Sequence, residues 1–329
     1  MKTVIWELFD KEDKNINFTP FLERALNVLD LSIEREEILF TVDTTNLETV
    51  VQKREVINLI RGLSDILNKN KIIILTSQSD EVINSNTLGS EFEVKSIFED
   101  GFCLVEHKRK IEKFSDYKTQ KPFFLSKFYF PKSIVDAKFI VPINMFDTSP
   151  IFGIKGVVSS FFWFLPTYTR SEILILENII NRSTALLEAF SEISKRIIFA
   201  VNLLLNEVNM ATISEDSVAT DAFTSALVGI KALSIPITKI ANKKKLGTGD
   251  IMRLIISGEK FSKPVTFLER KEVDKSVTIN SAKCNLCMKC LDFCPLGAII
   301  IDEENLCINN DKCNKCAYCI EICPLKAIN

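Results

Sequence analysis

The stretch CNLCMKCLDFCP at residues 284–295 is repeated as CNKCAYCIEICP at residues 313–324. A shift of 29 positions superposes the four cysteines and the proline of the first run on those of the second. Matching residues continue on both sides of each run. The duplication predicts a small α+β unit over residues 276–329 with a pseudo-two-fold repeat.

The cysteine spacing indicates the chemistry of this unit. A cubane 4Fe-4S cluster needs one thiolate on each of its four irons, and a C-x2-C-x2-C run supplies three. In the two-cluster arrangement the fourth cysteine of each run, before the proline, binds the other cluster. We therefore predict two 4Fe-4S clusters as cofactors. The metal ligands are predicted to be Cys284, Cys287, Cys290 and Cys323 for cluster one, and Cys313, Cys316, Cys319 and Cys294 for cluster two. Structural zinc, which prefers paired C-x2-C knuckles separated by a spacer, is the disfavoured alternative.

The composition excludes several classes of protein. A formal net charge of -2 over 329 residues argues against a nucleic-acid partner bound by bulk electrostatics. The most apolar run, residues 156–168, is too short to span a membrane, and the first residues lack the apolar core of a signal peptide. We expect a cytoplasmic protein, because a reducing compartment keeps the clustered thiols available. The single histidine, His107, excludes a multi-histidine metal site, and Cys103 has no partner at ligand spacing.

The rest of the chain reads as an α/β domain. Short apolar runs at Val4–Phe9, Glu37–Val42 and Lys71–Ser77 predict buried strands. Between them, Thr19 is the expected N-cap of one helix, and apolar residues at helical spacing predict a second helix within residues 48–70. Strands that alternate with helices favour a mostly parallel sheet covered by helices.

The pattern of strands and helices is less regular in the later part of the domain. The expected elements are strand 137–146, helix 153–165, one long helix 171–193, strand 195–205, helix 214–230 and strand 250–258. A charged, proline-containing segment then marks a domain boundary. The predicted division is a domain at 1–257, a linker at 258–275 and the cysteine-rich unit at 276–329.

Two resemblances extend this interpretation. Residues 276–329 resemble bacterial-type two-cluster ferredoxin domains. The larger part resembles the domain of unknown function family 362, whose members often carry such a tail. The segments that carry this second resemblance are DAKFIVPINMFDTSPIFGIKGVVSSFFWFLP (136–166), SEDSVATDAFTSALVGIKAL (214–233) and LGTGDIMRLIISGE (246–259). Other motifs of that family are altered here, and the chain has no phosphate-binding glycine loop.

The resemblance leaves three candidate cofactor-binding residues, Lys155, Asp216 and Asp221. Asp216 is also placed to cap a helix, which competes with a ligand-binding role. Lys155 is expected to open a helix, where it either extends towards solvent or pairs with an anionic ligand.

Three functions are consistent with these features. The leading hypothesis is single-electron transfer through the two clusters, between a protein redox partner and the large domain or a complex. In the first alternative, the clusters are structural or regulatory and the chain is a binding or assembly protein. In the second, the chain is an oxidoreductase with its active site at the carboxyl ends of the large domain's strands. Whether the large domain is an enzyme, and which small molecule it binds, stay open.

Overall fold

The structure is a computed structural model of the chain. It describes residues 1–10, 15–31, 36–45, 47, 49–67, 71–77, 83, 85–88, 92–97, 104–106, 111–112, 114–118, 123–125, 127–205, 208–269, 277–303 and 305–329. Cys103, His107 and the end of the predicted linker lie outside the described residues.

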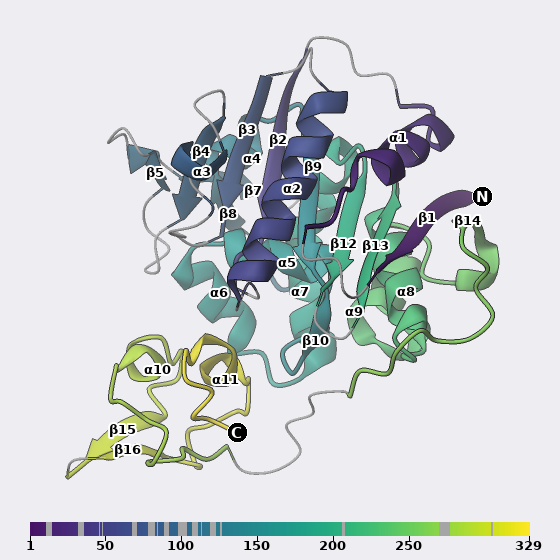
Figure 1. The fold of residues 1–329 in the computed structure, drawn as a ribbon. Coiled ribbons are helices and arrows are strands. Elements are labelled where there is room, and N and C mark those ends of the chain that lie inside the picture. Colours follow the sequence, from purple (N-terminus) through teal and green to yellow (C-terminus); the bar gives the residue numbers. More distant parts are fainter. Residues whose placement is uncertain are drawn as a thin grey trace.

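The large part is built on one mixed sheet (Figure 1). Its strands, in spatial order, are β14 (Leu254–Gly258), β1 (Lys2–Phe9), β13 (Asn209–Ser214), β12 (Ala200–Leu204), β9 (Phe139–Met145), β2 (Glu37–Val42), β3 (Lys71–Thr76), β4 (Glu93–Ile97), β5 (Leu104–Glu106) and β6 (Ile111–Glu112). The run from β12 through β9, β2 and β3 to β4 is parallel, whereas β13 is antiparallel to both of its neighbours. The prediction of a helix-covered, parallel-rich sheet is confirmed.

Helices cover both faces of the sheet (Figure 1). One face packs against α1 (Thr19–Val28) and α2 (Val50–Ile66). The other packs against α5 (Val157–Ser160), the 3-10 helix η1 (Phe161–Phe164), α6 (Thr167–Leu174), α7 (Ile179–Ile193), α8 (Ser217–Leu227) and α9 (Pro236–Lys243). The central strands are apolar on both faces because both faces are covered.

Short elements complete the domain. They are α3 (Ser85–Leu88), α4 (Lys132–Asp136), the hairpin β7 (Phe114–Lys118) with β8 (Lys127–Pro131), the hairpin β10 (Asp147–Ser149) with β11 (Gly153–Lys155), and the 3-10 turns η2 (Ser194–Arg196), η3 (Ala232–Ser234) and η4 (Ile251–Arg253).

Several predicted elements differ from the structure. The long helix predicted over 171–193 is interrupted, and α7 starts afresh where the Asn178 side chain accepts a hydrogen bond from the Asn181 N–H. The helix predicted over 153–165 is instead the strand β11 followed by α5 and η1, so Lys155 ends a strand and does not open a helix. Thr19 is the first residue of α1, whose N-cap is Phe18.

The predictions around β12 and β13 also need correction. The strand expected over 195–205 begins only at Ala200, after η2. Residues 209–214 form β13, a central strand that the apolar pattern did not predict. The closing strand begins at Leu254, because Asp250 caps the turn η4 through its side chain. The helix predicted over 214–230 is confirmed as α8.

The C-terminal unit repeats in its backbone conformation. Its elements are α10 (Lys289–Asp292), β15 (Ile299–Asp302), β16 (Asn305–Ile308) and α11 (Tyr318–Ile322). Positive φ angles recur 29 positions apart, with 57° at Leu286 and 56° at Lys315, 60° at Met288 and 64° at Ala317, and 55° at Gly297 and 48° at Lys326. The two cysteine runs therefore coil in the same way.

The C-terminal unit lies against the carboxyl edge of the parallel strands. Strands β9 and β2 are neighbours in the sheet. The next parallel strand after β2 is β3, on one side of this pair, and the next parallel strand after β9 is β12, on the other side. The carboxyl ends of β2 and β9 thus form a switch point, where open α/β sheets bind ligands. Beyond this edge, α10 and α11 lie below β10 and α6 in the view of Figure 1.

Candidate metal centre and adjoining cavity

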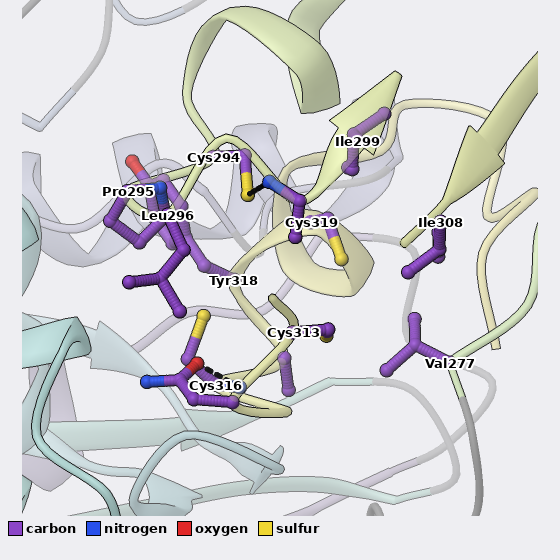
Figure 2. Close-up of a pocket in the computed structure, with 13 residues that line it drawn as sticks. Val277, Cys294, Pro295, Leu296, Ile299, Ile308, Cys313, Cys316, Tyr318 and Cys319 are labelled. Carbon is purple, nitrogen blue, oxygen red and sulfur yellow. Dashed lines mark hydrogen bonds between the residues drawn. The ribbon is translucent and has the colours of Figure 1, made fainter. Parts of the chain in front are cut away.

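The eight cysteines of the two runs divide into two groups, each around its own cavity. Figure 2 shows the cavity lined by Cys294 together with Cys313, Cys316 and Cys319. A second cavity is lined by Cys284, Cys287, Cys290 and Cys323. In each group, three cysteines of one run meet the proline-linked cysteine of the other. These groupings coincide with the predicted ligand sets for clusters two and one.

Backbone N–H groups donate hydrogen bonds to cysteine sulfur atoms in both cavities, as suits a cluster held by thiolates. The Ala298 N–H donates to Cys294 Sγ at 3.2 Å, a contact drawn in Figure 2, and the Ala327 N–H donates to Cys323 Sγ at 3.3 Å. Such bonds favour charged sulfur and tune cluster potentials. Since four soft sulfur ligands converge on each cavity, the residues fit a 4Fe-4S cubane.

Burial disfavours thiolates at these positions unless a metal compensates their charge. Burial, and then neighbouring thiols, raise the pKa of Cys319. Burial also raises the pKa values of Cys290 and Cys316 against opposing backbone hydrogen bonds. A bound metal restores the thiolate form, because coordination deprotonates a thiol.

The remaining described cysteine has a different environment. Cys307 lies on β16 opposite Ile300, is half-buried and lines neither cavity. None of the nine described cysteines forms a disulfide. Outside the two cysteine groups, the described residues include no group of three His, Cys, Asp or Glu side chains that could hold a metal ion.

Arg182 on α7 is a buried cation beside the Figure 2 cysteines. Its Nε donates to the Leu176 carbonyl oxygen at 2.9 Å. Burial lowers the pKa of Arg182, and attraction to Cys316 opposes that effect. The same attraction acts to lower the pKa of Cys316, although burial dominates there. The large part therefore places a positive charge close to a predicted ligand of cluster two.

A buried ion pair joins the C-terminal unit to the sheet edge. Lys155 Nζ lies 3.0 Å from Glu321 Oε2, and the two side chains are 12% and 3% exposed. Ser149 Oγ donates to the other carboxylate oxygen of Glu321 at 2.6 Å. Burial acts to lower the pKa of Lys155, but attraction to Glu321, Asp43 and Asp147 outweighs it and raises the pKa. Lys155 is thus held as a charged partner of α11.

Asp43, which follows β2 directly, lies at the same edge. Its Oδ1 accepts hydrogen bonds from Thr45 and from Ser77 Oγ, whereas Oδ2 has no partner among the described residues. Burial raises the pKa of Asp43, although these hydrogen bonds and Lys155 oppose the shift. Asp43 and Lys155 line one small cavity with Glu321.

A much larger cavity, of about 760 Å³, lies between the C-terminal unit and the sheet edge. Its wall includes Thr44 after β2, Asp147 on β10 and Lys155 on β11. From the other side it includes Tyr318, Glu321 and Cys323. This volume is within the range of small-molecule sites. Since Cys323 also lines the second cysteine cavity, the large cavity adjoins the predicted position of cluster one.

Aromatic side chains make the second contact across the junction. The rings of Trp163 and Tyr318 stack with centroids 5.7 Å apart and an interplanar angle of 23°. The Arg170 guanidinium lies 5.8 Å from each ring centroid, within the range of cation–π attraction. Asn314 Nδ2 donates to the Leu174 carbonyl oxygen nearby.

The three residues implied by the family resemblance do not form one site. Lys155 lines the large cavity, as described. Asp216 caps α8 by accepting from the Val218 and Ala219 N–H groups. Asp221 is 2% exposed and accepts from two N–H groups at the start of α5 and from Asn202. Neither aspartate lines the large cavity.

A glycine makes the position of Asp221 possible. A Cβ added at Gly156 would lie 2.5 Å from Asp221 Cγ, so only glycine allows the carboxylate to approach the start of α5 so closely. This close approach gives Asp221 a role in the packing of α5 against α8.

Several residues of the junction were not predicted from the sequence. They are Asp43, Arg170, Arg182, Tyr318 and Glu321. The available signals were a charged residue directly after the apolar run of β2 and arginines within otherwise apolar helical segments. Neither signal specifies a partner in the C-terminal unit.

Comparison with protein families identifies the class of the C-terminal unit. Residues 276–324 match the 4Fe-4S dicluster domain family. The unit is therefore an iron-sulfur domain of ferredoxin type that carries two 4Fe-4S clusters and has the capacity for electron transfer. A comparison with curated proteins gives no match.

Two solved structures are weakly similar to the chain. A protein from Thermotoga maritima aligns at 13% identity with a TM-score of 0.39, over 64% of this chain and 56% of that one. Lactate racemase apoprotein from Thermoanaerobacterium thermosaccharolyticum aligns at 14% identity with a TM-score of 0.39, over 64% of this chain and 57% of that one. The chain thus spans little more than half the length of either protein, and nothing about function follows from them.

The helices give one further finding. Within the part of the chain that the structure describes, no helix has the length and apolar character needed to cross a membrane.

The Lys155–Glu321 pair predicts a strong dependence of stability on both partners. In Glu321→Gln, Lys155 stays buried without its nearest carboxylate, so we expect a loss of about 3 kcal/mol in the free energy of unfolding. Adding Lys155→Met should recover most of it. The measurement is anaerobic urea unfolding of the four proteins of this double-mutant cycle. Asp136→Asn, which breaks the exposed Lys132–Asp136 pair, is the matched control and should cost under about 0.5 kcal/mol. Strictly additive losses would contradict the coupling.

Asp221 predicts a pH dependence of known sign. Burial raises the pKa of Asp221 from 3.8 to about 6, so the folded state binds this proton more tightly than the unfolded chain. The resulting stability is complete below the unfolded pKa and is lost as pH rises through the folded pKa. Relative to Asp221→Asn, the wild type should lose about 1 kcal/mol between pH 5 and 7.5. Parallel pH profiles in anaerobic urea unfolding would show that Asp221 does not titrate in this range.

Proposed function

We propose that the chain transfers single electrons through its two 4Fe-4S clusters, between a protein redox partner and a molecule bound at the large domain. The observation that carries this proposal is that Cys323 lines both the second cysteine cavity, where cluster one is predicted, and the 760 Å³ cavity at the sheet edge. An electron on cluster one would then lie at the wall of a cavity large enough for a substrate. The proposal therefore combines two of the hypotheses from the sequence: electron transfer through the clusters and an active site in the large domain.

The proposed ligand sets are those of the sequence prediction. Cluster one takes Cys284, Cys287, Cys290 and Cys323, and cluster two takes Cys313, Cys316, Cys319 and Cys294. The grouping of these side chains around two cavities supports the exchange of the proline-linked cysteines. The recurrence of φ angles supports a pseudo-two-fold relation between the runs.

The proposed roles of the two parts follow from their contacts. The C-terminal unit, 276–329, would accept electrons from a protein partner, and the domain at 1–257 would hold the molecule that exchanges them. The segment 258–275 would link the two parts. Its beginning is held on the large domain, because Trp6 Nε1 donates to the Glu259 carbonyl oxygen.

We also propose that the larger domain is a divergent member of the domain of unknown function family 362, on the basis of its three similar segments. Of the residues implied by that resemblance, Lys155 has the position best suited to ligand binding, because it lines the cavity. Asp216 and Asp221 would support helices α8 and α5. A cytoplasmic location is proposed from the thiol-rich unit.

Two contacts favour the alternative in which the clusters are structural. The Lys155–Glu321 pair and the Trp163–Tyr318 stack fix the iron-sulfur unit on the large domain. Clusters that serve only this attachment would show no reversible reduction in a potentiometric titration followed by EPR. Reversible one-electron reduction of both clusters is the outcome expected from electron transfer.

Exchange of the crossing cysteines predicts which cluster each substitution damages. Cys294→Ser should impair the cluster held by Cys313, Cys316 and Cys319, and leave the other intact. Cys323→Ser should have the opposite effect. The readouts are iron and sulfide content and the EPR spectrum of each reduced variant. Cys307→Ser is the matched control and should keep both clusters. If each substitution damaged the cluster of its own run instead, the proposed exchange would be wrong.

Arg182 predicts a change in the potential of cluster two alone. Removing a buried positive charge near Cys316 destabilises the reduced, more negative cluster. We expect Arg182→Met to shift one of the two reduction potentials downward by tens of millivolts, on the order expected for a nearby charge. Arg182→Lys should retain most of the wild-type potential. Arg253→Met, at an exposed position on η4, is the control. Equal shifts of both clusters would argue against a local effect.

A further inference from the structure

The large cavity has an unequal distribution of charge. Its lining includes the basic side chains Lys53, Lys155, Arg170, Lys289 and Lys326, against the acidic side chains Asp147 and Glu321. Lys155 and Glu321 pair with each other. Five basic side chains thus share the wall with two acidic ones, so the cavity favours an occupant with negative charge.

Arg170 is a buried basic side chain of this wall with little compensation for its charge. It is 5% exposed, and its Nη2 makes one hydrogen bond, to Thr167 Oγ1 at 3.2 Å. Its Nε has no acceptor, and it forms no ion pair within the described part of the chain. A buried cation is costly unless it is paired, and the faces of Trp163 and Tyr318 compensate it only in part.

Arg170 has different surroundings from the two cysteine groups. It lines the large cavity and neither cysteine cavity, and its guanidinium lies against the rings of Trp163 and Tyr318. The two arginines therefore serve different neighbours: Arg182 lies beside the Figure 2 cysteines, and Arg170 lies on the wall of the large cavity.

The rest of the lining indicates an organic occupant. Apolar and aromatic side chains share the wall with the cations, among them Leu47, Pro150, Trp163 and Phe293. Small-molecule sites combine such apolar walls with a few polar groups that fix orientation. An inorganic anion would satisfy the cations but not these surfaces.

We propose that this cavity binds a small organic anion, such as a carboxylate with an apolar body, and that Arg170 is its anchoring cation. The guanidinium fork offers the geometry that suits a carboxylate. The identity of this anion as the partner in electron exchange rests on the proposed function, whereas its binding does not.

The test uses two probes of the same shape and different charge. Isothermal titration calorimetry of the anaerobic holoprotein, with oxidised clusters and no reductant, compares 2-naphthoate with 2-naphthamide. We expect one site per chain and at least tenfold tighter binding of the carboxylate. Equal affinities, or no 2-naphthoate binding, would overturn the proposal. Orthophosphate tests the organic character, because binding as tight as that of 2-naphthoate would contradict it.

Substitutions test the role of Arg170. Arg170→Met should weaken 2-naphthoate at least tenfold and change 2-naphthamide by less than twofold, whereas Arg170→Lys should retain part of the preference. Lys244→Met, at an exposed position beyond α9, should change neither affinity. Unchanged 2-naphthoate binding by Arg170→Met would remove Arg170 from the site. If that variant fails to retain its iron, Lys53→Met near the start of α2 replaces it. We then expect a smaller loss of affinity for 2-naphthoate and no change for 2-naphthamide.

These outcomes separate the inference from the proposed function. Because binding is measured without reductant, failure of cluster reduction leaves the affinities unaffected. Conversely, reversible reduction of both clusters with no preference for 2-naphthoate would support electron transfer and refute the anion site.

Discussion

The buried pair between Lys155 and Glu321 is the contact on which the arrangement of the molecule depends. Lys155 comes from the carboxyl edge of the sheet, and Glu321 comes from the short helix α11, between Cys319 and Cys323. Burying either charge alone is costly, so the two parts are stable against each other only in the position where the charges meet. That position creates the large cavity and brings Tyr318 onto Trp163.

Helix α11 serves two purposes because it is short and flanked by cysteines. Cys319 and Cys323 turn towards the two cysteine cavities, while Tyr318 and Glu321 contact the large part. In five residues, the same backbone positions thiols and docks the unit. Cluster assembly and docking are therefore coupled, since a change in the coil of the second cysteine run also moves Tyr318 and Glu321, which hold the junction.

Local patterns explain what could be predicted from the sequence. The cysteine spacing indicated the dicluster unit, and continuous apolar runs indicated β2 and β3 within one residue of their bounds. The break between α6 and α7 was missed because apolar residues continue across it, and β13 because its run is short and partly polar. Glu321 was missed for a different reason: its partner is Lys155, far away in the chain, and no local pattern encodes that contact.

The two buried arginines suggest how the proposed sites influence each other. Reduction adds negative charge to a cluster, and an anion in the large cavity would add negative charge beside Cys323, which lines both cavities. These charges repel through an interior of low dielectric constant, where screening by salt is weak. By linkage, an occupied cavity makes the nearby cluster harder to reduce, and a reduced cluster weakens anion binding by the same factor. An anion that accepts the electron and then leaves the cavity carries negative charge away and so relieves this repulsion. The electrostatics of the junction therefore favour passing the electron to a molecule that leaves over keeping it on the cluster.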